Sequence, residues 1–224
     1  MYHPATPGRL LAAVAVCLLL GTTESKAELI TFEFSTQYLN SGPSDALDAF
    51  LNPGDEIVGR FTFESLTPDE DSSSEYGHFP AAITAASIQA GSHTFELNPA
   101  GPNGIEVKNV ELGPLGFANQ YDVWWDITPT LGFSEITASI HLSQLFAQPG
   151  DPMLVDGDSL PLTPPDPSLA NDNAWFMLSV DGQNFENSHL LPAPTIVRVP
   201  EPSTLALMVL VIIGIILNKR RKRR

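Results

Sequence analysis

The sequence predicts an all-β protein: an antiparallel β-sandwich of about nine strands, flanked by an N-terminal signal peptide and a C-terminal single transmembrane helix. Two observations support this fold class. Apolar and polar residues alternate through most of the central chain, which is typical of half-buried strands. Turn sequences rich in proline and glycine separate these stretches, and no stretch shows a convincing helical period.

The strands are predicted where every second residue is mostly apolar. The clearest alternation covers residues 30–34, 57–63, 121–127 and 136–142. Shorter candidates are residues 83–90, 93–97, 105–110, 174–180 and 195–199. Residues 45–51 have the length of one or two helical turns.

Residues 1–27 have the layout of a secretory signal peptide. Arg9 precedes an apolar run over residues 10–20, which is too short to span about 30 Å of hydrocarbon comfortably. Small residues, Ser25 and Ala27, occupy the −3 and −1 positions of a leader-peptidase site. We therefore expect cleavage after Ala27 and export of the remaining chain.

The predicted mature body, residues 28–198, is a single acidic domain without cysteine, because the one cysteine is Cys17. Disulfides, thiolate nucleophiles and cysteine metal sites are therefore excluded from it. The body contains 24 acidic residues and only three basic ones, a formal charge of −21; the three are Arg60, Lys108 and Arg198. Such a body is repelled by nucleic acid and anionic membranes, and it attracts divalent cations or cationic partners.

The C-terminal residues 199–224 combine three features. Pro200 and Pro202 favour an extended backbone around Glu201. Residues 205–217 are apolar and predict a short transmembrane helix, and residues 219–224 are six consecutive cations. Because cations hold their end in the cytoplasm, the body should lie outside the inner membrane.

This tail resembles the PEP-CTERM sorting signal of Gram-negative bacteria, with Pro200, Glu201 and Pro202 as its sorting motif. The resemblance implies recognition by an exosortase, a membrane-embedded enzyme that cleaves near the motif. The body would be anchored in the inner membrane transiently and then pass to the cell surface or to a biofilm matrix. An ordinary C-terminal anchor is the alternative.

A second, weaker resemblance covers the first half of the body. Gly59-Arg60-Phe61-Thr62-Phe63, an acidic loop, and Gly77-His78-Phe79-Pro80-Ala81-Ala82-Ile83 are similar to a layout that recurs among PEP-CTERM proteins of unassigned function. This similarity implies a β-rich fold and no known activity.

Two acidic loops are candidate calcium sites, since hard oxygen ligands suit Ca²⁺. One lies within residues 67–75 and the other within a Pro/Asp-rich insertion at residues 149–173. The candidate ligands are Asp69, Glu70, Asp71 and Glu75 in the first, and Asp151, Asp156 and Asp158 in the second. Neither loop has the spacing of an EF-hand, and simple solvated charge is the alternative.

Trp124 is a candidate carbohydrate-binding residue. Its neighbours Val123 and Trp125 fit the apolar face of their strand, so Trp124 shares the other face with Asp122 and Asp126. An exposed indole between carboxylates can stack on a sugar ring. The alternative is that both faces of this strand are covered. Trp175 alternates with Phe176 and is most simply assigned to the core, whereas His141 is expected to face solvent.

Catalytic signatures are absent from the sequence, which contains no nucleophile elbow, phosphate-binding loop or zinc-type histidine pair. We therefore predict a non-catalytic, exported protein of the cell surface or extracellular matrix that binds exopolysaccharide. The alternative is an extracellular polysaccharide hydrolase that uses paired carboxylates.

Overall fold

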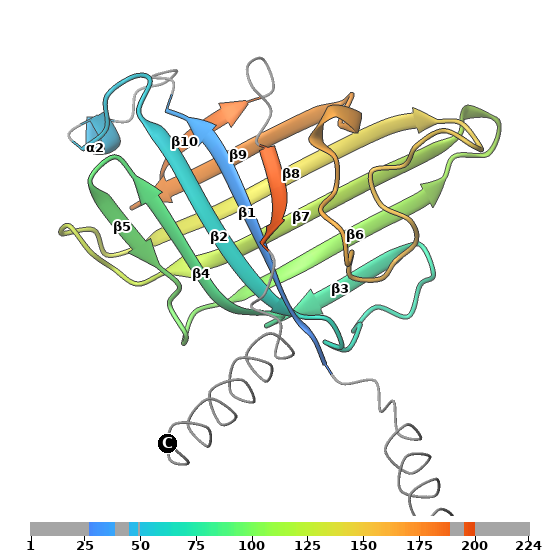
Figure 1. The fold of residues 1–224 in the computed structure, drawn as a ribbon, viewed down its shortest axis with the longest axis horizontal. Helices are drawn as coiled ribbons and strands as arrows, with labels where there is room; N and C mark the ends of the chain where they lie inside the picture. Colours follow the sequence, from blue (N-terminus) through green and yellow to red (C-terminus); the bar gives the residue numbers. More distant parts are fainter. Residues whose placement is uncertain (1–26, 39–44, 49, 189–194, 200–224) are drawn as a thin grey trace, which may run out of the picture.

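The computed structural model describes residues 27–38, 45–48, 50–188 and 195–199 (Figure 1). The predicted signal peptide, the Pro-Glu-Pro motif and the predicted transmembrane helix lie outside these ranges. Helical segments in the described part are α2 (Asp45–Asp48), η1 (Gly113–Leu115) and η2 (Pro167–Leu169). No helix within the described ranges is long and apolar enough to cross a membrane.

Two antiparallel sheets form the body and confirm the predicted β-sandwich. The first sheet has the order β11-β1-β2-β4-β5. Its strands are β1 (Leu29–Gln37), β2 (Glu56–Glu64), β4 (Ile83–Ala90), β5 (His93–Glu96) and β11 (Thr195–Val199).

The second sheet has the order β10-β9-β8-β7-β6-β3. Its strands are β3 (Tyr76–Pro80), β6 (Asn103–Glu111), β7 (Phe117–Ile127), β8 (Ile136–Ala147), β9 (Asn173–Val180) and β10 (Gln183–Ser188). In Figure 1 its strands pass behind those of the first sheet and cross them rather than running alongside. One face of this sheet packs on the core, and the other is its outer face.

The described residues contain eleven strands, more than the nine predicted. The two additional strands are β3 and β10. β3 contains Gly77 and Pro80, which are rare inside strands, and β10 is mostly polar, so neither has the alternation on which the prediction depended.

The core forms where the inward-facing residues of the two sheets meet. Trp125 on β7 is 1% exposed, and its ring lies 6.2 Å from that of Phe34 and 6.1 Å from that of Phe61. Gly59 on β2 pairs with Phe34 on β1, and a Cβ at Gly59 would lie 2.1 Å from the Phe34 ring. The glycine of the Gly-x-Phe-x-Phe stretch therefore makes room for a core phenylalanine.

The stretch from Gly77 to Ile83 forms a corner between the two sheets. β3 belongs to the second sheet and β4 to the first, with only Ala81 and Ala82 between them. Ala81 has φ +56°, and its N–H donates to the Asn103 carbonyl at 2.8 Å. The left-handed backbone conformation of Ala81 lets the chain turn sharply into the first sheet.

The long loop between β8 and β9 packs against the core. Leu154, Val155 and Leu160 are each at most 6% exposed and join the core cluster. The carbonyl of Asp158 lies so close to Gly77 that a Cβ there would be 1.8 Å from it. The loop therefore contacts edge strand β3 and is an integral part of the fold.

Candidate functional site

A row of polar and aromatic side chains crosses the outer face of the second sheet. Five residues on five adjacent strands are direct cross-strand partners in the antiparallel register. In order they are His78 on β3, Glu106 on β6, Asp122 on β7, His141 on β8 and Trp175 on β9. The sheet register alone therefore aligns two carboxylates between two histidines.

Each carboxylate in this row is paired with a histidine. His78 Nδ1 lies 3.2 Å from Glu106 Oε1, and both side chains are more than one-third exposed. His141 Nδ1 lies 2.5 Å from Asp122 Oδ1, and these side chains are only 17% and 18% exposed. The pair at the centre of the face is therefore the more enclosed one.

The two histidines also stack on the two outer-face tryptophans. The His141 and Trp175 rings are 5.0 Å apart and 16° from parallel, and the His78 and Trp124 rings are 6.0 Å apart and 17° from parallel. Trp124 lies over Gly104, where a Cβ would be 2.6 Å from the indole. The glycine on β6 therefore lets the indole lie close to the sheet.

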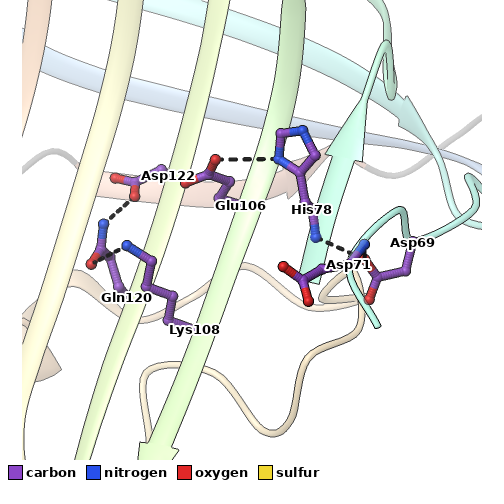
Figure 2. Close-up of polar contacts among 7 residues, drawn as sticks. All are labelled: Asp69, Asp71, His78, Glu106, Lys108, Gln120 and Asp122. Carbon is purple, nitrogen blue, oxygen red and sulfur yellow. Dashed lines mark hydrogen bonds and ion pairs between the residues drawn. The ribbon is translucent and has the colours of Figure 1, made fainter. Parts of the chain in front are cut away.

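A second polar chain reaches Asp122 from Lys108 on β6 through Gln120 on β7 (Figure 2). Lys108 Nζ donates to Gln120 Oε1 at 3.3 Å, and the Gln120 amide in turn donates to the Asp122 carboxylate. Lys108 also lies 6.0 Å from the centre of the Tyr76 ring. Asp122 is thus fixed from two sides, by His141 and by Gln120.

Two open hollows lie on this face and share Glu106. One, of about 230 Å³, is lined by Asp122, Trp124, Ser139 and Trp175 among others. The other, of about 300 Å³, lies between Tyr76, His78 and Lys108, beside Asp71 of the acidic loop. Together they form a shallow depression with aromatic walls and carboxylate groups at its centre.

Asp126 is set apart from this depression. It lies two residues beyond Trp124 on β7, and its side chain packs so close to Gly101 that a Cβ there would be 2.5 Å away. Burial, and then the nearby charge of Glu135, raise the pKa of Asp126 above its ordinary value. The predicted trio therefore divides, because Asp122 and Trp124 line one hollow and Asp126 does not.

The first acidic loop uses its carboxylates to hold its own backbone. Asp69 Oδ1 accepts from the N–H groups of Asp71 and His78, each at 2.9 Å, and Asp71 Oδ1 accepts from Ser73 N–H at 2.8 Å. The Glu70 N–H donates to the His78 carbonyl at 2.9 Å. The loop thus covers the free edge of β3 (Figure 2).

The other predicted calcium ligands are not gathered by the fold. Asp151 accepts from Gln148 N–H at 2.9 Å within its turn, and Asp156 lines a separate hollow of the long loop. Nowhere in the described ranges do three or more histidine, cysteine or acidic side chains come together as a metal site. Calcium binding stays a prediction that the fold does not support.

The assignment of Trp175 to the core is wrong, and three further residues of the row were missed. On β9 the buried residues are Ala174, Phe176, Leu178 and Val180, which places Trp175 with the half-buried outer residues. Its position in the alternation would have indicated this face, whereas its apolar character suggested the core. No local feature of the sequence indicates that His78, Glu106 and His141 belong to one site, because only strand pairing brings them together.

Comparison with known proteins identifies the C-terminal region. The model of one protein family, the PEP-CTERM protein-sorting motif, matches residues 198–222. The chain carries a PEP-CTERM sorting motif in this region. The motif indicates an exported protein that is sorted by an exosortase. No curated protein and no solved structure gives a match to the chain.

Proposed function

We propose that this protein, which carries the PEP-CTERM motif, is a non-catalytic protein of the Gram-negative cell surface or extracellular matrix that binds exopolysaccharide. The binding surface is the outer face of the second sheet. Leader peptidase and exosortase process the two ends, and residues 28–198 form the binding domain.

The observation that supports this proposal is the pair of tryptophans that line one hollow together with Asp122 and Glu106. Trp124 and Trp175 both line the hollow that contains Asp122. Aromatic rings stack on the apolar faces of sugars, and carboxylates accept hydrogen bonds from their hydroxyl groups. An open, shallow depression suits a polymer that extends beyond the site in both directions.

Hydrolysis is the second candidate, favoured by the direct pairing of Glu106 with Asp122 on neighbouring strands. A glycosidase needs one carboxylic acid and one carboxylate on opposite sides of the scissile bond. Here both carboxylates project from one sheet face, and each contacts a histidine. This arrangement suits binding better than cleavage.

The test is a pull-down of the processed protein with exopolysaccharide from the cells that export it. Trp124→Ala and Trp175→Ala should each weaken binding by about 1–3 kcal/mol, roughly 5- to 150-fold, if the rings stack on sugar. Val197→Ala, an exposed residue of the first sheet, is the matched control. Unchanged binding by both tryptophan variants would refute this site, and release of reducing sugar ends would favour the hydrolase.

A further inference from the structure

β11 is the edge strand of the first sheet and the last strand before the sorting motif. In the described part of the chain it pairs with β1 alone, with Thr31 opposite Val199 and Phe34 opposite Ile196. Pro200 follows Val199 directly. The body therefore leads into the Pro-Glu-Pro motif without any spacer.

Within the part of the chain that the structure describes, few side-chain contacts hold β11 in place. Ile196, 8% exposed, is its one buried residue, whereas Val197 is 53% exposed. The hydroxyl groups of Ser35 and Thr195 are 2.7 Å apart. A five-residue edge strand with one buried side chain is the kind of element that opens locally well before the whole domain unfolds.

Arg198 joins the end of β11 to two other segments. Its guanidinium donates to the Leu162 carbonyl of the long loop at 3.0 Å and forms an ion pair with the Glu28 carboxylate. Glu28 is the first residue after the predicted leader-peptidase site. The two processed ends of the chain therefore meet at one end of the first sheet.

The sorting motif overlaps this docked strand. The family match begins at Arg198, while Arg198 and Val199 are paired with Phe32 and Thr31 of β1. Enzymes that act on peptides commonly bind them as extended strands through main-chain hydrogen bonds. Main-chain groups of β11 that bond to β1 are not free to bond to an enzyme, so docking and recognition compete for the same residues.

We propose that β11 is the upstream part of the exosortase recognition segment, and that it must leave β1 before the exosortase can bind. The body then has a docked state and a released state, and only the released state is a substrate. The rate of processing depends on the population of the released state, and the chemistry of cleavage remains that of the exosortase.

A reversible cross-link tests this directly in the full chain, expressed with its exosortase and with Cys17→Ala throughout. Thr31→Cys with Val199→Cys ties β11 to β1, because directly opposed residues of antiparallel strands lie within disulfide reach. The oxidised variant should accumulate unprocessed, and reduction should restore processing. The control, Thr31→Cys with Thr62→Cys, ties β1 to β2 and should be processed normally. Normal processing of the oxidised β11 variant would overturn the proposal.

A second pair of variants, without introduced cysteines, tests whether loosening β11 speeds processing. Ile196→Ala removes the buried anchor of β11 and should speed processing about tenfold, which corresponds to loosening the docked state by about 1.4 kcal/mol. Leu115→Ala truncates an exposed residue outside β11 and should leave the rate unchanged. Slower or unchanged processing of Ile196→Ala would show that the docked strand is itself the recognised form.

Discussion

The rings of His141 and Trp175 lie 5.0 Å apart and 16° from parallel on neighbouring strands β8 and β9. This stack places Trp175 on the outer face, while His141 turns Nδ1 toward Asp122 on the next strand. Of the three tryptophans, Trp125 alone therefore belongs to the core, and the other two flank the depression on the outer face.

The three tryptophans should differ in their effect on stability. Trp125→Ala should lower the free energy of unfolding by about 3–5 kcal/mol, because it removes a fully buried ring between two sheets. Trp124→Ala and Trp175→Ala should each cost clearly less, since both residues are only half-buried. Urea melts of the three variants measure this, and equal losses would mean that the outer face is covered.

Gly104→Ala should disturb the depression without removing any of its side chains. The added Cβ would lie 2.6 Å from the Trp124 ring, so the indole must move. We expect weaker polysaccharide binding, a shifted tryptophan emission maximum, and a loss of stability of about 1–3 kcal/mol from overpacking. Thr137→Ala, at another position on this face, should change none of these, and an unaltered emission maximum in Gly104→Ala would contradict the packing.

Asp181 should make stability fall in acid. The Ser134 hydroxyl and the N–H groups of Glu135 and Ser134 donate to its carboxylate and hold the pKa below its ordinary value of 3.8. The ionised side chain therefore stabilises the fold above about pH 3.8, and this contribution is lost as the pH falls through the lower, folded-state pKa. Asp181→Asn should be less stable than wild type at pH 7 and should approach it near pH 2 in urea melts. A constant difference across this range would disprove a role for the charge.

Calcium and magnesium should have equal effects on thermal stability. The Asp69 and Asp71 oxygens already accept backbone N–H groups, so charge screening is the effect we expect from either cation. A site specific for calcium would raise the melting temperature in calcium above that in magnesium, by an amount that grows with concentration. Calorimetry at matched ionic strength distinguishes the two results, and a calcium-specific rise would establish the site predicted from the sequence.

Replacing Pro200 and Pro202 with alanine should block sorting. Without the two fixed φ angles, the apolar helix predicted from the sequence can extend toward the body and hide the recognition segment. The variant should remain unprocessed in the inner-membrane fraction, as detected by immunoblot. Release at the wild-type rate would show that the prolines are not recognised.

The strands were largely predictable because alternation is a local property. β4 (Ile83–Ala90) and β11 (Thr195–Val199) begin and end where the sequence indicated, and Trp125 is buried as its place in the alternation required. The sorting signal was equally readable, since its three parts follow one another within the last 26 residues. Strand β3 could not be predicted from the sequence. Gly77 and Pro80 interrupt its alternation, and its hydrogen-bond partner β6 lies beyond two intervening strands.

By itself, the sequence determined which residues face inward on most strands, and it contained the Pro-Glu-Pro sorting motif. Only the tertiary structure decided which outward residues become neighbours. His78, Glu106, Asp122, His141 and Trp175 span nearly a hundred positions, and they form one row solely through the register of five strands. The same holds for Glu28 and Arg198 at the two ends of the body. Side-chain alternation is set by backbone geometry within one strand. The register between strands is set by packing between them, so no single stretch of sequence determines that register.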